Sequence, residues 1–159
     1  MRFVLIAFIV AMFSLVVVLS CDNSEAKDPT EADIQKFVEI MTFIGDTMDD
    51  PPACVDIEES ETETSFTETI TFTDCDFEGI GVSGSLTLTG NMVSETQVTL
   101  NFSGTLNFTG EGAPASSVSF NFTLTITYPD SVEMSGTITI DGETFKASGF
   151  MDEFLYYYM

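Results

Sequence analysis

The chain has 159 residues, and its 26 acidic residues against four lysines and arginines give a formal net charge of −22 at pH 7. Such a charge repels nucleic acid and anionic lipid surfaces, which argues against both as binding partners. The chain has no histidine and no Gly-x-Ser-x-Gly motif, so the commonest general base and a common nucleophile motif are missing. We therefore expect a protein that is not an enzyme and has no cofactor.

The first twenty residues are typical of a leader. Met1 and Arg2 form a short positive region, and the run from Phe3 to Leu19 is apolar except for Ser14. An apolar run of this kind, followed by small-residue processing, is typical of a signal peptide. We expect a signal peptide over residues 1–20.

The leader ends in Val18-Leu19-Ser20-Cys21. This ending resembles the lipobox of bacterial lipoproteins, although Val18 stands where leucine is usual and Leu19 is bulkier than the common small residue. The resemblance implies that Cys21 is lipidated and becomes the new N-terminus, and that residues 21–29 form a tether to a membrane. It implies a cell-envelope location, on the periplasmic face or the cell surface. An ordinary secretory signal and an uncleaved anchor are the alternatives.

Residues 30–159 have a suitable length for a single domain. Loss of Arg2 with the leader would change the net charge from −22 to −23. If Cys21 carries lipid, Cys54 and Cys75 are left as a pair, and in an exported protein we expect them to form a disulfide. Closing the loop between Cys54 and Cys75 should stabilise the fold by about 3 kcal/mol.

An amphipathic helix is predicted directly after the tether. Thr30 provides a hydroxyl N-cap, and Glu31 and Asp33 suit the positive end of a helix. Pro51-Pro52 ends the pattern. Apolar residues recur between these limits with helical spacing, at Ile34, Phe37, Val38, Met41, Ile44 and Met48. We expect this apolar stripe to cover one face of a sheet, and the acidic stretch 46–63 to precede the first strand.

The remaining sequence alternates between apolar and polar residues. In 98–109 and 118–128, apolar residues occupy even positions, and threonine, serine or asparagine occupies almost every odd position. This alternation is typical of strands with one apolar face and one wet face. Similar patterns occur in 66–72, 80–88 and 132–140, so we predict an antiparallel sheet of six or seven strands.

Turn signals separate these predicted strands. They lie at Gly90-Asn91, Glu111–Ser117, Pro129–Ser131 and Asp141-Gly142. The last is the strongest, because Asp-Gly favours a two-residue type I′ turn. Such a turn pairs residue 140 with residue 143 and moves the apolar positions to odd numbers, as found for Phe145 and Ala147.

Three glycines share the apolar positions, namely Gly84, Gly104 and Gly136. A glycine there lets a strand coil sharply or lets another backbone approach closely. We therefore predict a mainly β fold in which an N-terminal amphipathic helix packs on a curled antiparallel sheet, as a half-barrel or barrel-like meander. The aromatic end, 150–159, is expected to add a last strand with Phe154, Tyr156 and Tyr158 on one side; the alternative is an exposed tail.

Two functions fit this sequence. The first is a non-catalytic binding or structural module that engages envelope proteins through the polar sheet face or the acidic stretch. The alternative is a lipocalin-like carrier of a hydrophobic ligand, with a pocket lined by Phe102, Phe108, Phe120, Phe122 and Phe145. A packed core is favoured over a pocket, because the helix supplies a plug of the right size.

One short acidic segment is a candidate calcium site. Asp74, Asp76 and Glu78 supply three carboxylates, and Gly79 follows as a turn residue. The spacing differs from an EF-hand loop, so we favour a solvated hairpin end and assign no metal.

Overall fold

The computed structural model describes residues 26–49, 51–128 and 131–152. They form helix α2 (Glu31–Asp49), seven strands and the short 3-10 helix η1 (Ala147–Phe150). The strands are β1 (Val55–Glu61), β2 (Ser65–Phe77), β3 (Ile80–Ser94), β4 (Gln97–Thr109), β5 (Ser117–Thr127), β6 (Ser131–Ile140) and β7 (Glu143–Lys146). The leader and Cys21 lie outside the described residues, as do Phe154, Tyr156 and Tyr158.

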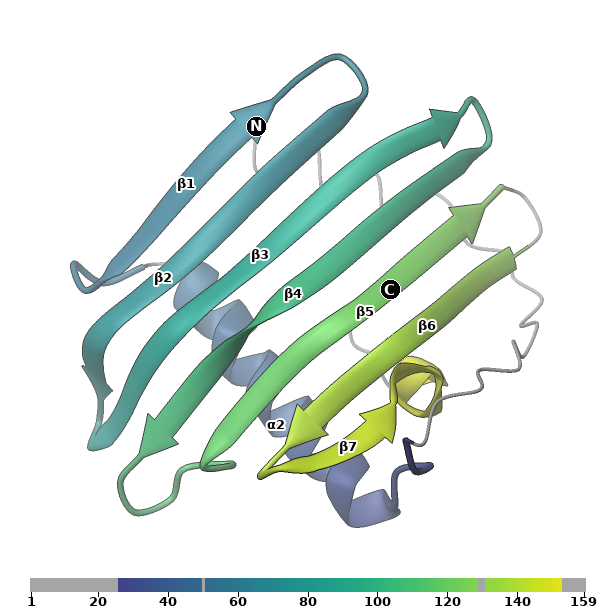
Figure 1. Cartoon of the computed structure of the whole chain (residues 1–159). Helices are drawn as coiled ribbons and strands as arrows, with labels where there is room; N and C mark the ends of the chain where they lie inside the picture. Colours follow the sequence, from purple (N-terminus) through teal and green to yellow (C-terminus); the bar gives the residue numbers. More distant parts are fainter. Residues whose placement is uncertain (1–25, 50, 129–130, 153–159) are drawn as a thin grey trace.

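All seven strands belong to one antiparallel sheet, in chain order from β1 to β7 (Figure 1). The prediction of a mainly β fold with six or seven strands is confirmed. The sheet is open, because β1 and β7 lie at opposite ends of the strand order. The acidic stretch was predicted to precede the first strand. That prediction is wrong, because β1 forms within it and pairs with β2 over its whole length.

Helix α2 begins where the sequence predicts. The Thr30 hydroxyl accepts the Asp33 backbone N–H at 3.4 Å, and the Asp33 carboxylate accepts the Thr30 backbone N–H at 2.9 Å. This reciprocal capping satisfies two amides that the first helical turn leaves without partners. The hydrogen bonds from Thr30 lower the pKa of Asp33.

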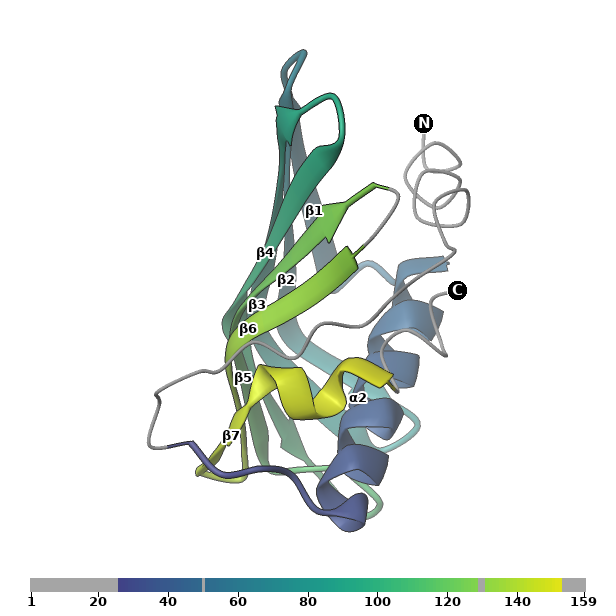
Figure 2. The ribbon, with the colours of Figure 1, turned by 90° about the vertical axis from the view of Figure 1, so that its right-hand side faces the viewer.

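Figure 2 shows α2 running along one side of the sheet. We call that side the inner face and the opposite side the outer face. Phe43 of α2 has its ring 5.0 Å from that of Phe77 and 5.8 Å from that of Phe108. The register sets Leu106, Val118 and Ile140 side by side on the inner face, and all three are buried. Burying each such side chain stabilises the fold by about 2 kcal/mol.

The three glycines on apolar positions bring neighbouring backbones close together, as predicted. Gly84, Gly104 and Gly136 have φ values of 122°, 133° and 101°, which side-chain-bearing residues rarely adopt. A Cβ atom on Gly104 would lie 2.9 Å from the Cα atom of Leu86 on the neighbouring strand, and it would also meet the Ser85 carbonyl oxygen. The three strands therefore need glycine at these close backbone contacts.

The turn predicted at Gly90-Asn91 is wrong. Strand β3 continues to Ser94, and the turn lies at residues 95–96. Gly90 pairs with Phe66 and Leu100 within the sheet, and the Phe66 ring occupies the space that a Cβ atom of Gly90 would need. This glycine therefore makes room for the Phe66 ring on the neighbouring strand. In the sequence alone, the glycine resembles a turn signal.

The Asp141-Gly142 turn is confirmed. Both residues have positive φ values, 53° and 81°, and Ile140 stands opposite Glu143. Phe145 is buried, as the predicted change of parity requires. Of the segment 150–159, expected to add a last strand, only residues 150–152 are described. Phe150 ends η1, and its ring lies 4.8 Å from that of Phe37 on α2.

The predicted disulfide between Cys54 and Cys75 is present, with the two Cα atoms 5.4 Å apart. It joins the residue before β1 to the second half of β2, beyond the register shift that separates Phe72 from Cys75. The Cys54 carbonyl also accepts the Thr73 backbone N–H at 3.0 Å. One end of β1 is therefore fixed to the sheet by a covalent bond and a hydrogen bond.

Candidate functional site

The five phenylalanines of the proposed pocket fall into two groups, one that packs within the sheet and one that contacts the helices. Phe102, Phe120 and Phe122 form one ring cluster, in which Phe102 and Phe122 stack with centroids 4.6 Å apart and planes 12° apart. Phe102 is half-buried, and the other two are buried.

The other two, Phe108 and Phe145, contact rings outside the sheet. Phe108 packs against Phe43 of α2, and Phe145 packs against Phe150 of η1, with centroids 6.1 Å apart. These rings fill space between the sheet and the two helices. Their contacts favour the packed core over a ligand pocket.

The three carboxylates of the calcium candidate lie at the hairpin between β2 and β3. Asp74 and Glu78 have positive φ values of 48° and 56°, and the Asp76 carboxylate accepts the Gly79 backbone N–H at 3.0 Å. Among the described residues, no three acidic or cysteine side chains gather in a metal-binding arrangement. The structure therefore does not bring these carboxylates together around an ion.

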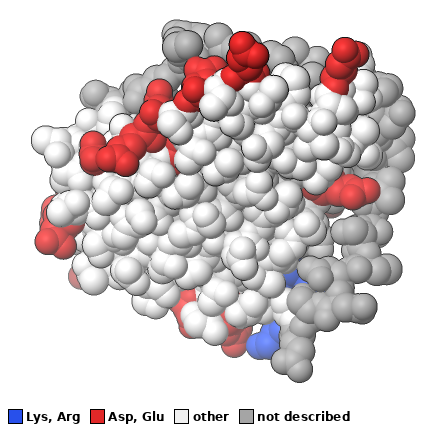
Figure 3. All heavy atoms as spheres, turned by 45° about the horizontal axis from the view of Figure 1, so that its top comes forward, with Lys and Arg blue, Asp and Glu red and all other residues white. Residues whose placement is uncertain are grey.

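The outer face of β3, β4 and β5, and of β2 as far as Thr71, carries no charged side chain; beyond the register shift in β2, Asp76 stands at its border, opposite Gly81. Its residues are those that point away from α2: Ser65, Thr67, Thr69, Thr71, Gly81, Ser83, Ser85, Thr87, Thr89, Asn91, Gln97, Thr99, Asn101, Ser103, Thr105, Asn107, Thr109, Ser117, Ser119, Asn121, Thr123, Thr125 and Thr127. Figure 3 shows this broad uncharged area with acidic side chains around its border. We call it the neutral face.

Hydrogen bonds between strands connect side chains of the neutral face. The hydroxyls of Thr69 and Thr87 lie 3.2 Å apart, and Thr123 donates to the Asn101 side-chain oxygen at 2.8 Å. Gln97 donates to the Thr127 hydroxyl at 3.1 Å. Because the partners stand opposite each other in the register, the sheet itself fixes the positions of these polar groups.

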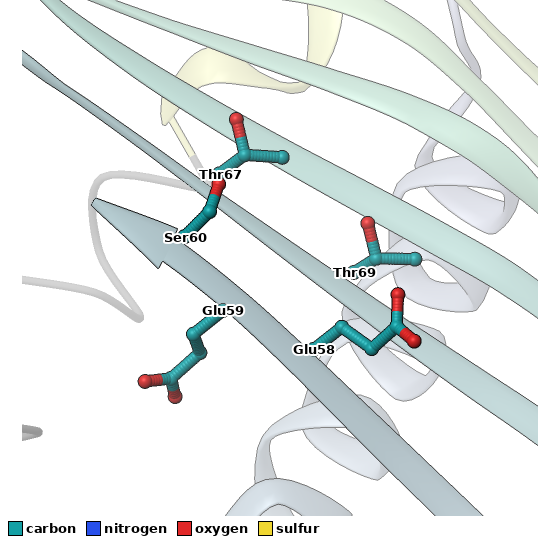
Figure 4. Close-up of a pocket in the computed structure, with 5 residues that line it drawn as sticks. All are labelled: Glu58, Glu59, Ser60, Thr67 and Thr69. Carbon is teal, nitrogen blue, oxygen red and sulfur yellow. The ribbon is translucent and has the colours of Figure 1, made fainter. Parts of the chain in front are cut away.

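Strand β1 forms an acidic edge to the sheet. Four of its seven residues are acidic, and we call Asp56, Glu58, Glu59 and Glu61 the acidic edge. Asp56 and Glu58 point to the outer side, and Glu59 and Glu61 point to the inner side. A hollow of about 480 Å³ lies where β1 meets β2, lined by Glu58, Glu59, Ser60, Thr67 and Thr69. In Figure 4 the Glu58 carboxylate lies beside Thr69.

The opposite edge carries two of the three lysines of the described residues, Lys27 and Lys146; the third, Lys36, lies on α2. Lys27 pairs through its backbone with β7, donating to the Thr144 carbonyl at 3.2 Å and accepting the Lys146 N–H at 2.8 Å. The Lys27 ammonium lies 3.4 Å from the Glu143 carboxylate, and the Lys146 ammonium lies 3.2 Å from that of Asp28.

Asp141 is the most strongly perturbed acid among the described residues. Its carboxylate accepts hydrogen bonds from the Lys36 ammonium at 2.8 Å and from the Ser116 backbone N–H at 2.6 Å. Burial alone raises the pKa of Asp141, but the hydrogen bonds from Lys36 and Ser116 outweigh it and lower the pKa from 3.8 to about 2. Asp141 thus fixes the β4–β5 loop and α2 to the β6–β7 turn.

Sequence reasoning located the neutral face but missed the acidic edge as a strand. Val55 and Ile57 alternate with Asp56 and Glu58, which is a short version of the pattern seen elsewhere. The abundance of acids concealed this signal, because glutamate is depleted in strands.

Among the described residues, no helix is long and apolar enough to cross a membrane. Comparison of the chain with known protein families, curated proteins and solved structures finds no match.

Proposed function

We propose that the protein is a non-catalytic binding module of the cell envelope, held to a membrane by a lipid on Cys21, and that the neutral face binds an envelope protein. The observation that carries this proposal is the charge distribution. In a chain of net charge −22, the outer face of β3, β4 and β5 and of β2 as far as Thr71 carries no charge.

Charge-free polar surface suits contact with another protein. Removing an ionised side chain from water costs several kcal/mol unless it is paired, whereas threonine and asparagine are less costly to desolvate. Several hydroxyls of the neutral face already have partners across the strands, such as Thr105 with Ser119 at 2.8 Å. Depletion of charge is also what distinguishes the centre of a protein interface from the rest of a surface.

The proposal includes a rigid support behind the neutral face. We propose that α2 packs along the inner face through Phe37, Ile40 and Ile44, which are all buried. The Phe43 contacts with Phe77 and Phe108 support this arrangement. A rigid sheet lowers the entropy cost of binding, because the polar groups of the neutral face need no further ordering.

Site-specific photo-cross-linking in the native cell tests the neutral face. A photoreactive residue at Ser103, an exposed position on β4, is expected to give a discrete cross-linked protein, and one at Glu111 in the β4–β5 loop is not. The variant Asn121→Lys places a charge opposite Ser103 and should abolish the adduct. Glu111→Lys is the control and should leave it intact. Equal labelling from both positions contradicts the proposal.

The membrane anchor is tested separately. We expect a fatty-acid analogue to label the wild-type protein in cells and to leave the Cys21→Ser variant unlabelled. Label retained by the variant contradicts lipidation at Cys21.

Native mass spectrometry distinguishes this module from the hydrophobic carrier. We expect the purified protein to give a single mass without an apolar adduct, because the ring contacts of Phe108 and Phe145 fill the core. A bound lipid that is lost on Phe122→Asp substitution, in a variant that still folds, favours the carrier instead.

A further inference from the structure

The outer edge of β1 is a second available surface, independent of the neutral face. Within the described residues, β1 pairs with β2 alone and stands at the end of the strand order. The Cys54 carbonyl accepts a hydrogen bond from the Thr73 N–H, and the Thr62 N–H donates one to the Ser65 carbonyl. The even-numbered residues of this segment therefore form the backbone hydrogen bonds to β2. In an antiparallel ladder the alternate residues turn their backbone groups the other way. Ile57, Glu59 and Glu61 therefore direct backbone donors and acceptors outward. The Val55 carbonyl also points outward, but the Val55 N–H already donates to the Pro52 carbonyl at 2.9 Å.

An open edge of this kind accepts another extended chain as a new strand. A second copy of this protein is a poor candidate, because its own β1 would bring four more carboxylates against the acidic edge. Like charges on paired strands destabilise the pairing. The charges therefore select against self-association while the backbone groups stay available.

We propose that the β1 edge binds an extended, lysine- or arginine-rich segment of a partner protein as an eighth strand. Glu58 and Glu59 are adjacent and point to opposite faces, so two consecutive basic residues of the segment would each meet one carboxylate. Apolar residues would lie beside Val55 and Ile57, which are half-buried at the inner face. The hollow beside Ser60 and Thr67 gives a basic side chain room to lie against the outer side.

Strands β1 and β7 differ in how their outer edges are covered. The backbone of Lys27 already occupies the β7 edge. At the other edge, the Cys54–Cys75 disulfide holds the beginning of β1 against β2, so an incoming strand meets an edge that is fixed at one end.

A designed peptide tests this proposal on the full-length protein in non-ionic detergent. In antiparallel register with residues 61 to 55, the complementary sequence is Lys-Thr-Lys-Lys-Val-Lys-Val. We expect a fluorescent form of it to bind, as measured by anisotropy. Binding should slow amide hydrogen exchange in residues 57, 59 and 61 by at least about tenfold, because those amides gain partners.

Two N-methylated peptides separate strand pairing from simple charge attraction. Methyl groups on the amides of the third and fifth peptide residues block the bonds to β1, and this peptide should bind at least about tenfold more weakly. Methyl groups on the fourth and sixth residues face away from β1 and should leave the affinity unchanged.

Two protein variants complete the test. Glu58→Lys combined with Glu59→Lys should abolish binding. Glu95→Lys combined with Glu111→Lys changes the net charge equally at exposed positions elsewhere and should retain most of the affinity. Circular dichroism checks that both variants fold. Equal binding of the two methylated peptides, equal loss in the two variants, no binding of the parent peptide, or protection of β1 by dimerisation without peptide would each overturn the proposal.

Discussion

At the β7 edge of the sheet, Lys27 forms backbone hydrogen bonds with Thr144 and Lys146, whereas β1 at the other edge has no strand beyond it in the described part of the chain. The β7 edge carries Lys27 and Lys146, which pair with Glu143 and Asp28, and Lys36 of α2 pairs with Asp141 in the adjoining turn. The β1 edge carries carboxylates and no cation.

This difference shows two ways to protect the end of a sheet. Covering an edge with the chain's own backbone satisfies its donors and acceptors permanently. Placing charges on an edge leaves those groups open and controls which chain can approach. Strand β7 is closed where Lys27 pairs with it, and β1 is closed mainly to acidic partners.

The largest expected effect comes from releasing β1. Replacing Cys54 and Cys75 together by serine should lower the free energy of unfolding by about 3 kcal/mol, because the unfolded chain gains freedom. Urea denaturation measures the total loss. Hydrogen exchange should show faster opening of β1 with little change in β7, and an equal increase at both edges would contradict the role of the disulfide in fixing β1.

The next effect concerns the β7 side. Asp141→Asn should lower the free energy of unfolding at pH 7 by about 1 to 2 kcal/mol, since the carboxylate is 31% exposed and partly screened. Asparagine tolerates the positive φ at this position, so the substitution removes mainly the charge.

The same variant has a defined pH dependence. The folded pKa of Asp141 lies below its unfolded value of 3.8, so its contribution is present above pH 4 and is lost as the pH falls towards about 2. Urea midpoints between pH 2 and 6 should therefore converge for wild type and variant at low pH. A constant difference across this range would contradict the assignment.

A third prediction removes the charges of the acidic edge. Glu58→Gln, Glu59→Gln and Glu61→Gln in one variant should strengthen self-association by about tenfold or more, because the open backbone edge remains and the repulsion is gone. Sedimentation velocity at several concentrations measures this. Replacing Glu95 and Glu111 by glutamine is the control. If the control associates to the same extent, net charge and not the acidic edge limits self-association.

The smallest effect is expected for Lys27→Met. The Lys27–Glu143 ion pair is exposed, at 65% and 61%, so its loss should change the free energy of unfolding by less than about 0.5 kcal/mol. The backbone bonds to Thr144 and Lys146 persist in this variant. Thermal unfolding checks the result, and a large loss would show that the side chain, not the backbone, covers the β7 edge.

Much of the fold follows from local pattern. The capped start of α2 at Thr30, the even-numbered apolar face of β4 and β5, and the Asp141-Gly142 turn are each set by residues close in sequence. The Cys54–Cys75 bond follows from counting cysteines. The predictions for α2, β4, β5 and the turn succeeded because neighbouring residues determine the backbone there.

The predictions were wrong where contacts between residues far apart in the sequence determine the structure. Gly90 followed by Asn91 resembles a turn signal. Glycine is needed there because the Phe66 ring on the neighbouring strand occupies the space of a side chain. The acidic β1 has weak strand propensity, and pairing with β2 overrides it. The ring partners of Phe108 and Phe145 lie on α2 and η1, so the sequence alone did not distinguish core from pocket.

The strict chain order of the strands has a consequence for how the domain folds. Among the described strands, each pairs with the strands before and after it in the sequence, so contacts between strands are local for a β protein, apart from the bridge between Lys27 and β7. Topologies with local contacts fold faster than those with long-range pairings. Tight hairpins at residues 78–79 and 141–142 can form independently at the two ends. We therefore expect folding to start from two separate nuclei, with the β4–β5 pairing across the loop at residues 110–116 joining them last.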